Sequence, residues 1–152
     1  MNKSNITIDL QNELNLAAVP DVVLLRRWVN AALQQAYSDL EQTIRIVDED
    51  ESQALNRAYR SKDHPTNVLS FPAEASEYID YDNLGDLVIC APIIEREAQQ
   101  QGKSVAAHWA HMVVHGMLHL QGYDHLDDEQ AAQMESLEIE ILATLGHTNP
   151  YL

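Results

Sequence analysis

Apolar and polar residues alternate in several short stretches that predict the strands of a sheet. Residues 6–10 alternate in this way and predict a first, half-buried strand. Residues 43–47, 66–71 and 85–91 predict three more strands, and the last of these contains a continuous apolar run from Leu87 to Cys90. The sequence therefore predicts a small four-stranded sheet.

Apolar residues at helical spacing predict two helices in the first half of the chain. Asp21 can cap the first helix, which should end near Tyr37. Its predicted core-facing residues are Leu25, Trp28, Val29, Ala32, Leu33 and Ala36. Asp50 should open the second, shorter helix. Its predicted core-facing residues are Ala54, Leu55 and Ala58.

Three further helices are predicted after the fourth strand. Pro92 suits the first position of a helix that Gly102 should close. The next helix, residues 105–121, carries apolar residues on nearly every side and should be central and mostly buried. Asp127 should cap the last helix, which Gly146 should end. Its predicted core-facing residues are Met134, Leu137, Ile141 and Leu145.

The order of these elements is typical of an α+β domain. The third and fourth strands have no helix between them and should pair antiparallel, whereas helical crossovers favour parallel pairing elsewhere. The acidic segment between Pro72 and Leu84 has no sustained period and is interpreted as a mobile surface loop. We predict a single domain over residues 1–152, with a small mixed four-stranded sheet packed by helices around a central histidine-bearing helix.

The charge of the chain complicates any role with nucleic acid. The composition, with 45% hydrophobic residues, suits a compact globule, but the net charge is −15 and nucleic-acid-binding surfaces are usually basic. The carboxylates concentrate in three segments, residues 48–51, 74–82 and 127–140. Three basic residues cluster before the predicted third strand, and they form either ordinary solvated side chains or a local basic cleft. These residues are Arg57, Arg60 and Lys62.

Cysteine usage and the amino terminus favour a cytoplasmic protein. The single cysteine, Cys90, cannot form an internal disulfide and lies in an apolar run, so we expect a buried, reduced thiol. No apolar signal region follows Met1, and no stretch approaches the roughly 18 apolar residues that a membrane helix needs.

Three histidines have a spacing that suits a metal ion. His115 and His119 lie on the same face of a helix, because successive residues turn by about 100°. Gly122 can end this helix in a left-handed conformation and fold the chain back, so that His125 supplies a third nitrogen. Three imidazoles leave one tetrahedral position open, which is typical of a catalytic zinc site.

Two further histidines leave another ligand pair open. His111 and His115 are also spaced as a pair on one helix face. We prefer the set that includes His119 because it alone uses the helix-ending glycine. His108 and His111 are then interpreted as hydrogen-bonding residues of the core or as outer partners of the ligands.

The spacing equals that of the metzincin signature H-E-x-x-H-x-x-G-x-x-H, with one difference. Gly116 occupies the position of the glutamate that serves metzincins as general base. The candidate ligands are therefore kept, but the peptidase base is lost. Gly116 has two interpretations: close packing against a neighbouring element, or room for substrate beside the metal.

Residues 115–125 match every fixed position of the motif H-G-x-L-H-L-x-G-Y-D-H, and in this the chain resembles the YbeY-type endoribonucleases, a family of bacterial 16S rRNA maturation factors. Residues 59–72 are similar to the family's other signature, and residues 85–90 to its next strand. The resemblance extends from about Thr43 to Tyr151.

The resemblance implies a single-strand-specific, metal-dependent endoribonuclease that acts in late 16S rRNA 3′-end maturation and ribosome quality control. It implies that His115, His119 and His125 bind one Zn²⁺ per chain, with His115 also counted as catalytic, although other divalent transition metals suit imidazole. It places Arg60 in the active cleft as a phosphate clamp, while the residues alone support equally an arginine favoured by the helix dipole. The expected partners are single-stranded RNA, the 16S rRNA precursor and ribosomal subunits.

Two other functions stay open. The metzincin spacing suggests a metallopeptidase, against which Gly116 counts. The acidic balance suits a non-catalytic ribosome-assembly factor with a structural zinc, which would dock onto basic ribosomal proteins as well as RNA.

Overall fold

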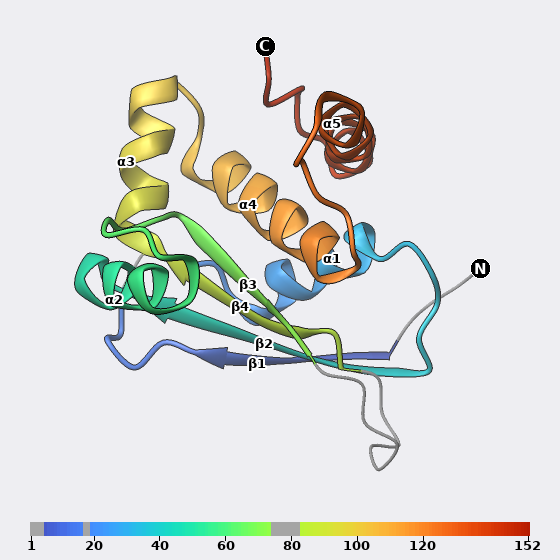
Figure 1. Ribbon diagram of the computed structural model, residues 1–152. Coiled ribbons are helices and arrows are strands. Elements are labelled where there is room, and N and C mark those ends of the chain that lie inside the picture. Colours follow the sequence, from blue (N-terminus) through green and yellow to red (C-terminus); the bar gives the residue numbers. More distant parts are fainter. Residues whose placement is uncertain (1–4, 17–18, 74–82) are drawn as a thin grey trace.

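The computed structural model describes residues 5–16, 19–73 and 83–152, and it has the predicted α+β architecture (Figure 1). The strands in this part of the chain are β1 (Asn5–Gln11), β2 (Asp39–Val47), β3 (Val68–Pro72) and β4 (Gly85–Cys90). The helices are α1 (Val22–Ala32), α2 (Glu49–Arg60), α3 (Ala91–Gln101), α4 (Val105–Leu120) and α5 (Asp128–Thr144).

The four strands form one mixed sheet in the order β1-β2-β4-β3. The pairs β1 with β2 and β2 with β4 are parallel, whereas β3 runs antiparallel to β4. The predicted antiparallel pair and the parallel pairing elsewhere are both confirmed. The segment interpreted as a mobile loop falls largely on residues 74–82, which lie outside the described residues.

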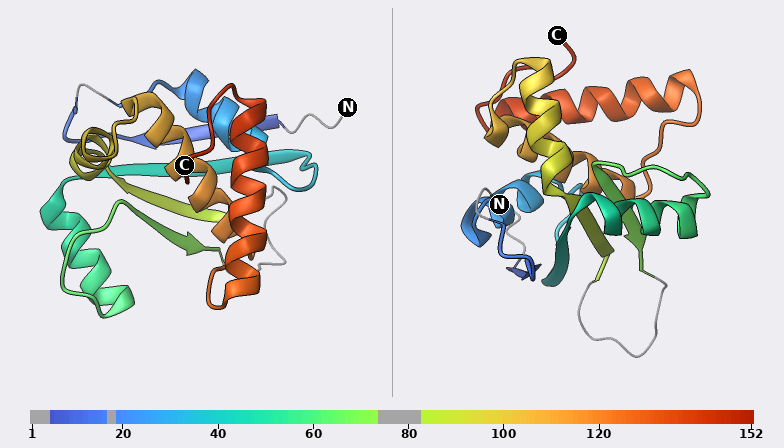
Figure 2. Two further views of the ribbon diagram at one scale, coloured as in Figure 1. Left: turned by 90° about the horizontal axis from the view of Figure 1, so that it is seen from above. Right: turned by 90° about the vertical axis from the view of Figure 1, so that its left-hand side faces the viewer.

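Helix α4 lies between the sheet and α5, so the histidine-bearing helix is central as predicted (Figure 2). Alternate β4 residues face opposite sides of the sheet. Leu87 and Ile89 belong to the core that α4 covers. Val88 and Cys90 belong to a smaller cluster on the other side, against which Leu55 of α2 packs. Cys90 is fully buried, and burial raises the pKa of its thiol, so the expectation of a buried thiol is confirmed.

Helix α1 is shorter than predicted. It begins after the expected cap, Asp21, but ends at Ala32 rather than near Tyr37, and Ala36 is exposed. The reason is a tertiary contact: the side chain of Gln121 accepts a hydrogen bond from the backbone N–H of Gln34 at 2.8 Å and donates one to the carbonyl of Ala32 at 2.8 Å. These bonds hold the backbone in an extended course that no local pattern specifies.

The buried face of α2 is polar, which contradicts the prediction. Asp48 rather than Asp50 caps the helix, and the predicted inward residues Ala54 and Ala58 are exposed. Ser52 and Asn56 are buried instead because their side chains bind the backbone of the following loop. The hydroxyl of Ser52 donates to the carbonyl of Thr66 at 2.8 Å, and the amide of Asn56 donates to that of His64 at 2.9 Å.

Helix α5 begins and packs as expected. Asp127 caps it by accepting a hydrogen bond from the backbone N–H of Gln130 at 2.8 Å. Met134 and Ile141 are buried, and Leu137 and Leu145 pack partly against the same core. Among the helices that the structure describes, none has the length and apolar character needed to cross a membrane.

Candidate functional site

Helix α4 places His115 and His119 side by side, and the chain turns sharply where the helix ends. Gly122 follows the helix with a φ of +99°, in the left-handed region that favours glycine, as predicted. Its N–H binds the carbonyl of His119 at 3.0 Å, and the N–H of Tyr123 binds that of Leu118 at 3.1 Å. These two bonds are the Schellman pattern of helix termination, and they send the chain back toward the helix.

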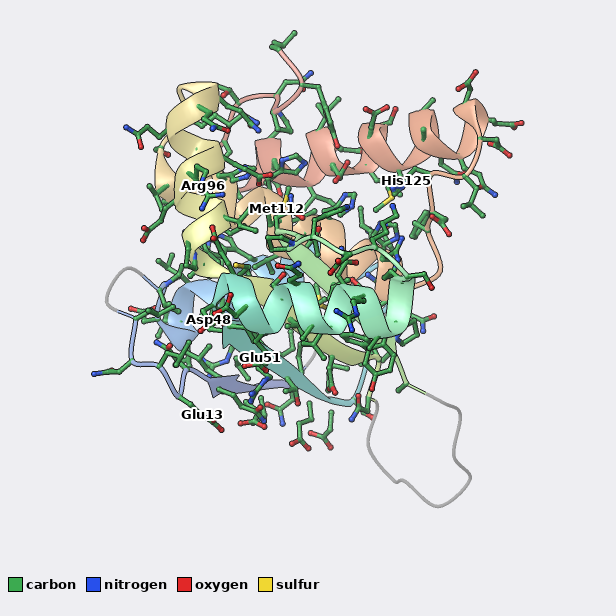
Figure 3. All side chains as sticks on the ribbon, turned by 60° about the vertical axis from the view of Figure 1, so that its left-hand side comes forward. Glu13, Asp48, Glu51, Arg96, Met112 and His125 are labelled. Carbon is green, nitrogen blue, oxygen red and sulfur yellow. The ribbon has the colours of Figure 1, made fainter. Side chains whose placement is uncertain are left out.

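The turn brings the third histidine to the first two. Ligand atoms of His115, His119 and His125 all lie within 4.8 Å of one another, and the Nε2 atoms of His115 and His119 are 3.0 Å apart. His125 is exposed and lies in the segment that leads into α5, where Figure 3 labels it. His111 belongs to no such group among the described residues, although its ring lies 6.3 Å from that of His115.

Hydrogen bonds fix the tautomers of both helix histidines. His119 Nδ1 lies 2.9 Å from the carbonyl oxygen of Tyr123, and His115 Nδ1 lies 2.6 Å from Oε1 of Glu138. Both partners accept hydrogen bonds, so each Nδ1 carries the hydrogen that it donates. The Nε2 atoms of His115 and His119 then lie 3.0 Å apart, a separation at which they can share a metal ion when neither is protonated. The donor set therefore fits a metal ion.

The protonation state of His119 also suits a metal ligand. Burial is the main cause that lowers the pKa of this imidazole, and the neighbouring His115 lowers it further. A neutral ring leaves its lone pair available to a metal ion.

A polar cleft of about 480 Å³ opens beside the three histidines. Arg60 and Lys62 line the same cleft, and neither side chain takes part in an ion pair with another described residue. The third basic residue, Arg57, pairs with Asp63 at 4.0 Å and does not line the cleft. The structure thus places the predicted Arg60 and the predicted histidines on one cleft, together with a second cationic side chain, Lys62.

The loop that carries Lys62 is held by the buried polar face of α2. Ser52 and Asn56 bind its backbone at Thr66 and His64, and the N–H of Thr66 returns a bond to the Ser52 hydroxyl at 2.9 Å. Asp86 of β4 does not line this cleft and instead lines a different pocket with Arg45 on the other face of the sheet.

Glu138 is a residue of the site that the sequence reasoning missed. Its side chain is fully buried, and Oε1 lies 2.6 Å from His115 Nδ1 and 3.3 Å from His111 Nε2. Burial tends to raise the pKa of this carboxyl, but hydrogen bonds with His111, His115 and Tyr151 outweigh it and lower the pKa to about 2. The signal in the sequence was an acidic residue between Met134 and Ile141 on the apolar face of α5.

The interpretation of His108 and His111 as hydrogen-bonding residues agrees with their contacts. His108 Nε2 lies 2.9 Å from Oε1 of Glu97 on α3, and His111 lies behind His115, beside Glu138. His108 is therefore a core residue, and His111 is an outer neighbour of the candidate metal centre.

Gly116 is in close contact with the sheet. A Cβ atom there would lie 2.8 Å from Leu87 Cδ2 and 3.3 Å from Val68 Cγ2. We expect Gly116→Ala to lower the free energy of unfolding by about 1 kcal/mol, because overpacking costs about 1–3 kcal/mol and the helix propensity of alanine returns about 1 kcal/mol. Urea denaturation measures this change. Leu87→Val in the same background should recover part of the loss, and a stabilised Gly116→Ala protein would contradict the packing interpretation.

Comparisons with known proteins agree with this geometry. The family model described as Endoribonuclease YbeY matches residues 9–146. A protein named Endoribonuclease YbeY from Pseudomonas putida (strain W619) is 56% identical to this chain, and the match covers 96% of this chain and 93% of the relative. A protein of the same name from Stutzerimonas stutzeri (strain A1501) is 54% identical, and the match covers 96% of this chain and 91% of the relative. The solution structure of TM1509 from Thermotoga maritima superimposes with a TM-score of 0.53 at 25% identity, covering 95% of this chain and 97% of that one. With the histidine cluster, the cleft and these matches in agreement, the chain belongs to the YbeY endoribonuclease family.

Proposed function

We propose that this protein is a zinc-dependent endoribonuclease that cuts single-stranded RNA in the cleft between the histidine cluster and Arg60. The observation that carries the proposal is the pair of His115 and His119 Nε2 atoms 3.0 Å apart, in a cleft that Arg60 and Lys62 also line. The names of the relatives support the reaction. Three neutral imidazoles favour zinc, and nickel or copper also suits them.

His115, His119 and His125 would hold the ion. When bound, zinc supplies Lewis acidity, which lowers the pKa of water and polarises a phosphoryl oxygen. The protein's own contribution is positioning. Arg60 presents a planar, permanently charged donor group to the scissile phosphate and stabilises the charge that develops on its oxygens. Lys62 adds a point charge that attracts the RNA backbone.

The substrate in this proposal is the 3′ precursor end of 16S rRNA on ribosomal subunits in the cytoplasm, with a further part in ribosome quality control. Family membership supports this choice. The charge distribution is compatible with it, because a chain with a net charge of −15 still presents Arg60 and Lys62 to the cleft. The acidic remainder repels RNA elsewhere and suits contact with basic ribosomal proteins.

A peptidase is disfavoured by the surroundings of Gly116. A Cβ atom at this position would lie 2.8 Å from Leu87 Cδ2 and 3.3 Å from Val68 Cγ2, so a glutamate would have to displace side chains of the sheet. The catalytic base of a metzincin is absent from the sequence, and the close packing disfavours a larger residue in its place.

The proposal is tested with a single-stranded RNA that bears the 16S 3′ precursor end, supplied alone or annealed to a complementary strand. We expect the zinc-loaded protein to cut the free strand and to leave the duplex and casein intact. Cleavage of casein, or equal cleavage of the duplex, would contradict the proposed specificity.

A further inference from the structure

The carboxylate of Glu138 joins the candidate metal centre to a residue far along the chain. Oε1 lies 2.6 Å from His115 Nδ1 and 3.3 Å from His111 Nε2, while Oε2 accepts a hydrogen bond from the hydroxyl of Tyr151 at 2.5 Å. The Tyr151 hydroxyl also lies 3.4 Å from His111 Nε2. The Glu138 side chain has 0% exposed surface, so protein groups supply the partners of both oxygens. Both oxygens of a buried carboxylate are thus engaged, one toward the site and one away from it.

The segment after α5 is shaped to bring Tyr151 to this point. Gly146, with a φ of +86°, ends α5, and the N–H of His147 binds the carbonyl of Leu142 at 2.9 Å, which reverses the chain. The side chain of Asn149 then accepts a hydrogen bond from the N–H of Tyr151 at 2.8 Å. The Tyr151 ring packs edge-on against His111, with centroids 5.4 Å apart and planes at 84°.

We propose that Tyr151 is a positioning residue of the metal centre, which acts through Glu138 on the orientation of His115. The terminal torsion of a glutamate is broad, so a carboxylate held by one oxygen alone can rotate. The hydroxyl of Tyr151 restricts that rotation and keeps Oε1 on His115 Nδ1, which turns His115 Nε2 toward the ion. This inference rests on the proposed metal centre and assigns a role to two residues outside the cleft, because neither Glu138 nor Tyr151 lines it.

The position of the cavities agrees with a supporting rather than a catalytic role. A separate, smaller cavity of about 270 Å³ lies on the α5 side of His115 and His125, and Glu138 and Tyr151 line it. The two histidines therefore separate this cavity from the cleft that Arg60 lines. Tyr151 therefore supports His115 from the α5 side and does not line the cleft in which the phosphate would bind.

Zinc affinity, measured by competition with a chromophoric chelator, tests the inference without RNA. Glu138→Gln should weaken affinity about 10–100-fold, the range for an outer partner of a histidine ligand. Tyr151→Phe removes only one hydroxyl and should weaken it about 2–10-fold, the range for one hydrogen bond. In the double variant, Tyr151→Phe should add little to Glu138→Gln, because the carboxylate through which Tyr151 acts has been replaced.

Glu97→Gln is the matched control. Glu97 accepts a hydrogen bond from His108, another buried histidine of α4, which lies outside the cluster of candidate ligands. The zinc affinity of the Glu97→Gln variant should stay within about twofold of that of the unaltered protein, even if the thermal midpoint of the variant falls. Cobalt substitution gives a second readout, because the visible spectrum reports ligand geometry: Tyr151→Phe should change it and Glu97→Gln should not.

Two results would overturn the inference: unchanged zinc affinity and cobalt spectrum in Tyr151→Phe, or fully additive losses in the double variant. An unaltered protein that binds no metal would overturn the metal centre and this inference together. Intact binding without RNA cleavage would overturn the proposed activity and leave the role of Tyr151 standing.

Discussion

Arg60→Ala is expected to keep its zinc and to lose RNA cleavage by roughly two orders of magnitude or more, the usual scale for removing one group that stabilises transition-state charge. The side chain lines the same cleft as the three histidines and makes no ion pair with another described residue, so its charge is available to substrate. It is exposed, and folding should therefore change little. Zinc content, thermal midpoint and single-turnover cleavage of the 16S 3′ precursor RNA measure the three parts of this expectation.

Lys62→Ala is the control for Arg60, since it removes the other unpaired cation that the structure places in the lining of this cleft. It should cost less activity because an ammonium group lacks the rigid, forked donors that match a phosphate. Full cleavage by Arg60→Ala would remove Arg60 from the mechanism. Loss of zinc from that variant would mean that Arg60 has a structural role.

His115→Ala is expected to have the largest effect of any single substitution. It removes one of three candidate ligands and leaves the buried Glu138 without its partner at 2.6 Å. Zinc affinity should fall by more than about 100-fold, because even an outer partner of a ligand is worth 10–100-fold. Cleavage should fall to background. Metal analysis after dialysis and the cleavage assay with the same RNA measure both effects.

His108→Ala is the matched control, because it removes a buried histidine from the same helix that is not in the cluster. It should lose stability but retain zinc and cleavage. A folded His115→Ala protein that lacks zinc yet still supports 16S rRNA maturation and binds ribosomal subunits would contradict catalysis and favour the assembly-factor function.

The sequence predicted those parts of the fold and site that local spacing specifies. The helical spacing of His115 and His119 and the glycine at 122 have direct geometric consequences, and the three histidines do converge. The lack of a helical pattern in the sequence between the third and fourth strands was likewise enough to predict their antiparallel pairing.

Features that depend on distant partners could not be predicted in this way. Helix α1 ends where Gln121 binds its last turn and the residues that follow, a contact across 87 residues. The inward face of α2 is polar because it binds a loop backbone, whereas periodicity arguments assume that an inward face is apolar. Glu138 and His115 are 23 residues apart, and a buried carboxylate is recognised only when its donors are known.

The most direct test of the central claim is the rate at which the unaltered protein cuts single-stranded 16S 3′ precursor RNA before and after its metal is removed. After treatment with a chelator and removal of the chelator, cleavage should be lost, and it should return on addition of about one equivalent of zinc per chain. Protein shown by elemental analysis to be free of metal, yet cutting the RNA at the original rate, would contradict a metal-dependent endoribonuclease.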